Sequence, residues 1–175
     1  MIDKRAEFVK KWYGRGVNEE DPFDQFFSLW IALVIASARW HTLQNSEIRD
    51  QTDREKIIQY FEGHCGQVLS LLTPGTREVK DLAFREGSSY GNPILDSGNL
   101  DLRAKFKRFA EHWATGQRLD EDELIKTFGE IINKIRNNVF HGVKIYDDRD
   151  DVAVLKLINP ILRDVLRRCE AGIVN

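Results

Sequence analysis

Hydrophobic residues recur along most of the chain at the three- and four-residue spacing of amphipathic helices, and no segment alternates between apolar and polar positions as a strand would. This spacing predicts helices over residues 3–12, 22–40, 52–72, 102–113, 121–141 and 151–169, with a short one over residues 77–84. We therefore expect an all-α fold, an antiparallel helical bundle of about five to seven helices, in a single domain spanning residues 1–175. An irregular loop is predicted near residues 86–99.

The residues at several predicted helix ends support these boundaries. Asp21 can cap the second helix, and Pro22 suits its first position. Thr52 and Glu55 have the spacing of a capping box at the start of the third helix. The second helix is apolar nearly all round, which is typical of a helix in the middle of a bundle or a dimer. Pro160 is expected to kink the last helix.

The composition narrows the class of protein. The 175 residues are 42% hydrophobic and 31% charged, as in a soluble globular domain. A net charge of −2 means that any RNA binding must come from a local site and not from a general basic surface. Two cysteines, Cys65 and Cys169, exclude a disulfide scaffold and a multi-cysteine zinc site. The N-terminus does not resemble a secretory signal, and no apolar run reaches the roughly 20 residues of a membrane span. We expect a cytoplasmic protein.

The most informative segment is IINKIRNNVFHG, residues 131–142. On a helical wheel the positions that face the core are Leu124, Phe128, Ile132, Ile135 and Val139. The other side carries a continuous arc of Arg136, Asn137, Phe140 and His141, which Gly129 and Asn133 extend along the helix. The helix therefore presents a second, chemically distinct face.

This second face predicts a contact with another helix or another subunit. Phe140 points away from its own core stripe and needs a second apolar surface. Gly129 costs about 1 kcal/mol relative to alanine inside a helix, and the close approach of a neighbouring backbone would explain it. We expect Phe140, Gly129 and Asn133 to contribute to a dimer interface, with packing of Phe140 on the last helix of the same chain as the alternative.

Arg136 and His141 are the candidate catalytic residues. Gly142 is expected to end the helix, so that His141 lies at the C-terminal end, where the macrodipole favours a protonated imidazole. A histidine near its titration range beside a permanent cation suits acid–base work on a phosphodiester. The two side chains are about 140° apart on a straight helix. A symmetric dimer would bring two copies of each into one cleft.

The sequence from Arg136 to His141, RNNVFH, resembles the R-N-x-x-x-H signature of the HEPN superfamily (higher eukaryotes and prokaryotes nucleotide-binding). The surrounding IRNNVFHGVK and the later Arg149-Asp150 resemble the Apea-like and toxin-type branches. The segment DPFDQFFSLWIAL, from Asp21 to Leu33, resembles their buried helix. Together these segments cover about a third of the chain.

The resemblance implies a helical bundle that dimerises through the helix carrying Arg136 and His141, and in many members a metal-independent endoribonuclease. His141 would activate a ribose 2′-OH or protonate the leaving oxygen, Arg136 would stabilise charge on the phosphate, and Asn137 would orient the scissile group. The expected products are a 2′,3′-cyclic phosphate and a 5′-OH, and the need for a 2′-OH makes RNA the substrate. No metal or cofactor is expected.

Other polar clusters have simpler interpretations. The acidic residues Asp147, Asp148, Asp150 and Asp151 lack the spacing of a calcium loop and are interpreted as a solvated turn that caps the last helix, with a metal nuclease as the alternative. Lys105, Lys107 and Arg108 alternate with Phe106 and Phe109, but both rings share a core stripe, which favours a solvated helix over an RNA-binding surface. His64 and both cysteines are interpreted as structural.

Two hypotheses of different classes follow. The first is a dimeric HEPN ribonuclease that acts as a toxin or phage-defence effector and is controlled by an antitoxin or nucleotidyltransferase partner. The second is a non-catalytic module that uses the same surface to bind a partner or a nucleotide. RNA cleavage that depends on Arg136 and His141 distinguishes them.

Overall fold

The computed structural model describes residues 3–44, 51–72, 81, 104–105, 108, 111, 115, 120–140, 149–170 and 173. Within these ranges all regular secondary structure is α-helical, which confirms the predicted all-α class. The helices with defined bounds are α1 (Lys4–Asn18), α2 (Pro22–Leu43), α3 (Asp53–Gly63), α4 (Cys65–Leu72), α7 (Glu121–Phe140) and α8 (Arg149–Cys169). The predicted loop at 86–99 lies outside the described residues, as does most of the helix predicted over 102–113.

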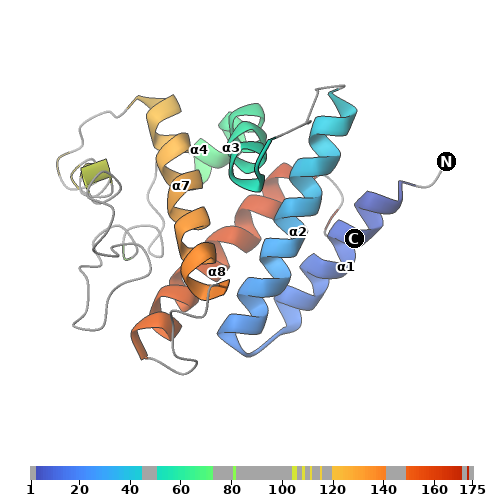
Figure 1. Ribbon diagram of the computed structural model, residues 1–175, viewed down its shortest axis with the longest axis horizontal. Helices are drawn as coiled ribbons and strands as arrows, with labels where there is room; N and C mark the ends of the chain where they lie inside the picture. Colours follow the sequence, from blue (N-terminus) through green and yellow to red (C-terminus); the bar gives the residue numbers. More distant parts are fainter. Residues whose placement is uncertain are drawn as a thin grey trace.

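The first two helices, α1 and α2, lie side by side (Figure 1). Asp21 caps α2 as predicted, because its Oδ1 accepts hydrogen bonds from the backbone N–H groups of Phe23 at 2.9 Å and Asp24 at 3.0 Å. The prediction that α1 ends near residue 12 is wrong, since it continues to Asn18. Gly16 lies in the added part of the helix: a Cβ there would lie 2.8 Å from Cγ of Leu29, so a glycine allows α1 to approach α2 closely.

The helix predicted over residues 52–72 consists of two helices, α3 and α4. Its start is as predicted: the backbone N–H of Thr52 donates to Glu55 Oε2 at 2.8 Å, and the Thr52 side chain accepts from the Glu55 backbone, which completes the capping box. The break falls at His64. A Cβ on Gly63 would collide with the indole of Trp40 in α2, so the chain passes this ring only because residue 63 is glycine.

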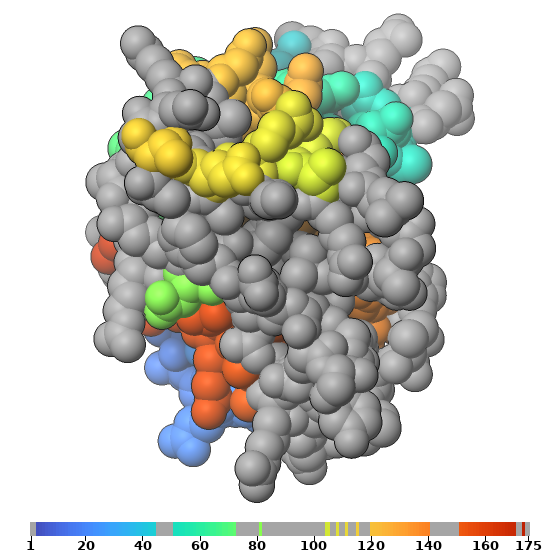
Figure 2. All heavy atoms as spheres, turned by 90° about the vertical axis from the view of Figure 1, so that its left-hand side faces the viewer, coloured from blue at the N-terminus to red at the C-terminus, as the bar shows by residue number. Residues whose placement is uncertain are grey.

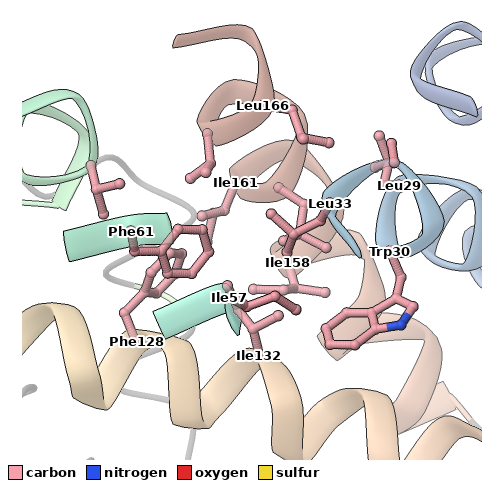
Figure 3. Packing of buried hydrophobic residues seen from close by; sticks show 14 of the residues in the cluster. Leu29, Trp30, Leu33, Ile57, Phe61, Phe128, Ile132, Ile158, Ile161 and Leu166 are labelled. Atoms are coloured by element: carbon pink, nitrogen blue, oxygen red, sulfur yellow. The ribbon is translucent and has the colours of Figure 1, made fainter. Parts of the chain in front are cut away.

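One hydrophobic core joins all six helices. Figure 3 shows Ile57 and Phe61 of α3 meeting Phe128 and Ile132 of α7, with Leu33 and Ile158 from two further helices. The core stripe predicted for α7 is confirmed: Leu124, Phe128, Ile132 and Ile135 are buried, and Val139 is partly buried against the core. These contacts fix α7 along its whole length.

The second helix, α2, contacts α1, α3 and α8 (Figure 1). By length and composition it is apolar enough to cross a membrane, but half of its most apolar window is buried inside the fold. A buried core helix passes the same test, so α2 is no argument for a membrane protein. Its apolar surface is used for packing against neighbouring helices.

The last helix, α8, begins at Arg149, slightly earlier than predicted, and continues through Pro160. The side chain of Asn159, one residue before the proline, donates from Nδ2 to the carbonyl oxygen of Pro22 at 2.9 Å. This bond ties the middle of α8 to the start of α2. Asp151, in the first turn of α8, is only 2% exposed, which corrects its interpretation as part of a solvated turn. Asp147 and Asp148 lie outside the described residues.

Two cations of the segment before α7 form ion pairs with that helix. Lys105 Nζ lies 3.1 Å from Glu130 Oε2, and Arg108 Nη2 lies 3.1 Å from Glu123 Oε1. Figure 2 shows the described residues of this segment beside α7 at the top of the face it presents. Because their charges are used within the chain, these cations are poor candidates for phosphate binding.

Candidate functional site

The candidate site lies at the C-terminal end of α7. Arg136 Nη1 donates a hydrogen bond of 2.8 Å to Oδ1 of its neighbour Asn137, and both side chains are half-buried. The described part of α7 ends at Phe140. His141 and Gly142 lie outside the described residues, so the predicted pairing of Arg136 with His141 stays a prediction.

The guanidinium of Arg136 is held against two aromatic rings. Its Cζ lies 5.6 Å from the ring centroid of Trp30 in α2 and 5.4 Å from that of Phe140. Trp30 is only 4% exposed, so one face of the cation is shielded from water. A cation–π contact is worth about 0.5–2 kcal/mol, with the larger values at desolvated sites. Arg136 is therefore oriented by packing and not free to move as a surface arginine.

The Nε of Arg136 is buried and has no hydrogen-bond partner among the described residues. A buried N–H without an acceptor costs free energy, and because this atom is shielded from solvent an approaching phosphate cannot reach it directly. The helical wheel placed Arg136 on the outer arc of α7. The structure instead turns its side chain toward α2, where the electron-rich face of the Trp30 indole attracts the cation.

Phe140 packs on α2 of the same chain. Its ring centroid is 5.4 Å from that of Phe27 and 6.5 Å from that of Phe26. The second apolar surface that the sequence requires is thus supplied in part by α2. Phe140 nevertheless remains 37% exposed. Part of its ring is still accessible to another molecule.

Gly129 is buried at the contact between α7 and α3. A Cβ there would lie 2.7 Å from Ile58 Cγ1 and 3.7 Å from Phe61 Cδ2. The close approach predicted for this glycine is therefore made by α3 within the same chain, which corrects its assignment to a dimer interface. Asn133 is half-buried and stays a candidate interface residue.

A row of side chains extends from the Arg136 site across α2 to α1. The ring of Phe140 is followed by Phe27, and the Phe27 ring lies 6.2 Å from that of Trp12 in an edge-to-face arrangement. Arg15 places its Cζ 5.4 Å from the Trp12 centroid. We call Arg15, Trp12, Phe27, Phe140 and Arg136 the arginine–aromatic row. The four-residue spacing of Arg136 and Phe140 within α7 could have predicted their contact with each other. The contacts of Phe140 with Phe27 and of Phe27 with Trp12 join separate helices, and no sequence spacing predicts them.

A second polar cluster lies where α1, α2, α3 and α8 meet. Glu170 accepts hydrogen bonds of 3.0 Å from both the Tyr60 hydroxyl and Arg39 Nη1, and Arg39 Nε lies 2.7 Å from Asp3 Oδ2. Arg39 holds the pKa of the Asp3 carboxyl below its usual value. Burial raises the pKa of the Cys169 thiol to about 12 and also raises that of Tyr60. Because its charges are paired with one another, this cluster is structural.

The remaining histidines of the described residues bond to backbone. His41 Nε2 lies 3.2 Å from the Lys56 carbonyl oxygen, and His64 Nδ1 lies 2.9 Å from that of Tyr60. Within the described ranges, no group of three or more His, Cys, Asp or Glu side chains is arranged to hold a metal ion. The chemistry that the described residues offer is therefore concentrated at Arg136.

Comparison of the chain with protein-family models, with curated proteins and with solved structures found no match.

Proposed function

We propose that this protein is a HEPN-type, metal-independent endoribonuclease that acts as a cytoplasmic homodimer. The observation that carries the proposal is the fixed guanidinium of Arg136, bonded to Asn137 at the C-terminal end of α7 and lodged against Trp30. His141 follows Phe140 directly in the sequence. In the proposal, the helices form an antiparallel bundle, and two copies meet through the α7 face that carries Phe140 and Asn133.

The reaction needs two proton transfers and one site for negative charge. His141 removes the proton of a ribose 2′-OH or donates a proton to the leaving 5′-oxygen, and the second copy of His141 in the dimer cleft, or a water molecule, carries out the other transfer. The 2′-oxygen attacks phosphorus and the bond from phosphorus to the 5′-oxygen breaks, which leaves a 2′,3′-cyclic phosphate and a 5′-OH. Arg136 stabilises the charge that develops on the phosphate oxygens. Asn137 holds the guanidinium through its Oδ1.

The decisive experiment is an incubation of the purified protein with single-stranded and structured RNA in the presence of EDTA. We expect cleavage that persists in EDTA and is lost in His141→Ala and Arg136→Ala. Arg136→Lys keeps the charge but not the planar fork and should lower the rate about a hundredfold. Arg163→Ala, which removes an exposed arginine of α8, is the matched control and should leave the rate unchanged.

Loss of cleavage in EDTA, or full activity of both alanine variants, would refute this mechanism. The end groups of the products give an independent check, because a metal-dependent nuclease that uses water leaves no 2′,3′-cyclic phosphate. Thermal unfolding of each variant shows whether a loss of rate reflects a loss of fold.

A non-catalytic module that binds a nucleotide or a partner is the second candidate. The observation that favours it is the partial exposure of Phe140 and Phe27 beside the Arg136 site. It predicts binding without any RNA cleavage under the conditions above.

In the ribonuclease proposal, the biological role is that of a toxin or phage-defence effector, restrained by an antitoxin or nucleotidyltransferase partner.

A further inference from the structure

The arginine–aromatic row combines three aromatic rings with two guanidinium groups. Its rings belong to three helices, and each neighbouring pair of rings is in contact, at 6.2 Å for Trp12 with Phe27 and 5.4 Å for Phe27 with Phe140. Phe27 is 39% exposed, comparable to Phe140. Partly exposed large aromatic side chains that adjoin one another mark a binding surface more often than an accident of packing.

A guanidinium stands at each end of this row. Arg15 lies over Trp12 at one end, and Arg136 lies over Phe140 at the other. Arg15 is exposed, whereas Arg136 is half-buried. Rings that can stack with bases and cations that can pair with phosphates are the two components by which proteins bind single-stranded nucleic acid. Since the chain carries a net charge of −2, such a local arrangement is the route to RNA binding open to it.

We propose that the row is a base-stacking platform for unpaired nucleotides of single-stranded RNA, and this inference rests on the proposed ribonuclease function. The phosphate to be cleaved lies at Arg136. The adjoining unpaired bases stack on Phe27 and Trp12, and Arg15 pairs with a phosphate farther along the strand. A base inside a duplex has no free face to offer, so the platform selects single strands.

Charge favours RNA over an apolar partner as the occupant. A protein partner could also cover the rings, but it would have to place a carboxylate or carbonyl oxygen opposite each of the two guanidinium groups. A polynucleotide supplies a phosphate for each cation and a flat apolar base for each ring. The row ends at Arg136, the residue proposed to stabilise the reacting phosphate, so one RNA strand can contact the rings and Arg136 at the same time.

The test measures RNA binding in the His141→Ala background, where no cleavage competes. Fluorescence anisotropy compares a labelled single-stranded oligonucleotide with a fully paired duplex of the same sequence. We expect the single strand to bind more tightly, and Phe27→Ala and Trp12→Ala each to weaken it by about 5- to 150-fold. The matched control is Leu43→Ala, which truncates another exposed apolar side chain of α2, at its opposite end, and should leave the affinity unchanged.

Arg15→Gln provides a variant that leaves the packing of the rings intact. It should lower the slope of log affinity against log salt concentration by about 0.7, the value for one phosphate contact with a single strand. Equal affinity for the single strand and the duplex, or equal effects of Phe27→Ala and Leu43→Ala, would overturn the platform. So would a Phe27→Ala variant that loses dimerisation in sedimentation but keeps its RNA affinity, because the row would then be a subunit contact.

The two proposals fail separately. Binding that depends on Phe27 without any cleavage in the unsubstituted protein would refute the ribonuclease and retain the platform. Cleavage that depends on Arg136 and His141 but is indifferent to Phe27, Trp12 and Arg15 would refute the platform alone.

Discussion

The guanidinium of Arg136 lies 5.6 Å from the ring centroid of Trp30, which joins the end of α7 to a buried residue of α2. This contact converts a flexible side chain into one with a fixed orientation. It connects two segments far apart in the sequence, the RNNVFH segment and the apolar helix that Asp21 caps. The core packing of α2 and the position of the candidate catalytic cation are therefore linked.

The first prediction concerns Trp30 as a positioning residue for Arg136. Trp30→Leu removes the ring face, so that the guanidinium gains freedom, and we expect kcat for RNA cleavage to fall about tenfold while KM changes less. Trp30→Phe should restore part of kcat, because it keeps an aromatic face. The measurement is steady-state kinetics on a single-stranded RNA.

A matched core substitution separates positioning from stability in this experiment. Leu33→Ala removes a fully buried side chain of the same helix and should cost about 2–5 kcal/mol of unfolding free energy. At a temperature where all variants are folded, it should leave kcat unchanged. An equal fall of kcat in Leu33→Ala and Trp30→Leu would contradict the positioning role.

The second prediction uses Gly129 and the contact between α7 and α3. Gly129→Ala places a Cβ 2.7 Å from Ile58 Cγ1, and overpacking of this kind costs about 1–3 kcal/mol, which outweighs the gain in helix propensity of about 1 kcal/mol. We expect a net loss of unfolding free energy in urea. Truncation of the neighbour in Gly129→Ala/Ile58→Ala removes the clashing Cγ1 and should recover part of it.

Gly14 is the control for Gly129. A Cβ at this position in α1 has nothing within 4 Å, so Gly14→Ala gains helix propensity without a clash. It should raise the unfolding free energy by about 0.5–1 kcal/mol. If Gly129→Ala were as stabilising as Gly14→Ala, the close packing of α7 on α3 would be wrong.

The third prediction is a loss of stability at alkaline pH. The folded protein holds the pKa of Cys169 at about 12 against 9.0 for an ordinary thiol, so between these values the unfolded chain releases a proton that the folded chain keeps. The contribution of Cys169 to the unfolding free energy should therefore be constant below about pH 9. It should fall as the pH rises above 9, by at most about 1.4 kcal/mol per pH unit. Tyr60, whose pKa is also raised, acts in the same direction.

Urea denaturation between pH 8 and pH 11 measures this slope. Cys169→Ala should make the decline shallower, because it removes one of the groups whose pKa is raised in the folded protein. Cys65→Ala, which removes the exposed cysteine, should leave the slope as it is in the unsubstituted protein. A slope that responds equally to both substitutions would argue against a special environment for Cys169.

The fourth prediction concerns the proposed dimer. Phe140→Asp introduces a charge at a ring that is 37% exposed and should abolish self-association in sedimentation experiments. Leu43→Asp places the same charge on a residue that is 60% exposed at the end of α2 and should leave association intact. A folded Phe140→Asp protein that still forms dimers would remove Phe140 from the interface.

Local signals in the sequence predicted the all-α class and several boundaries. Asp21 and the pair of Thr52 with Glu55 cap helices through bonds to residues two or three positions away, which a linear pattern contains. The core stripe of α7 follows from its period of 3.6 residues. Such features depend only on neighbours in the chain.

The features that the sequence did not predict depend on residues far apart along it. The close approaches of α1 and α3 to α2 depend on Leu29 opposite Gly16 and on Trp40 opposite Gly63. The orientation of Arg136 depends in the same way on Trp30. A glycine or an arginine alone does not reveal its spatial neighbour, so these contacts require the tertiary structure.

The guanidinium of Arg39 bonds to Asp3 at the start of α1 and to Glu170 just after α8. Opening of the first turn of α1 therefore leaves Glu170 with a weakened partner, and unwinding of the end of α8 does the same to Asp3. Fraying at the two ends is thermodynamically coupled, so amide hydrogens in both turns should exchange with solvent deuterium at similar rates, and Arg39→Ala should speed both together. The start of the first helix and the end of the last helix are therefore coupled through one arginine side chain.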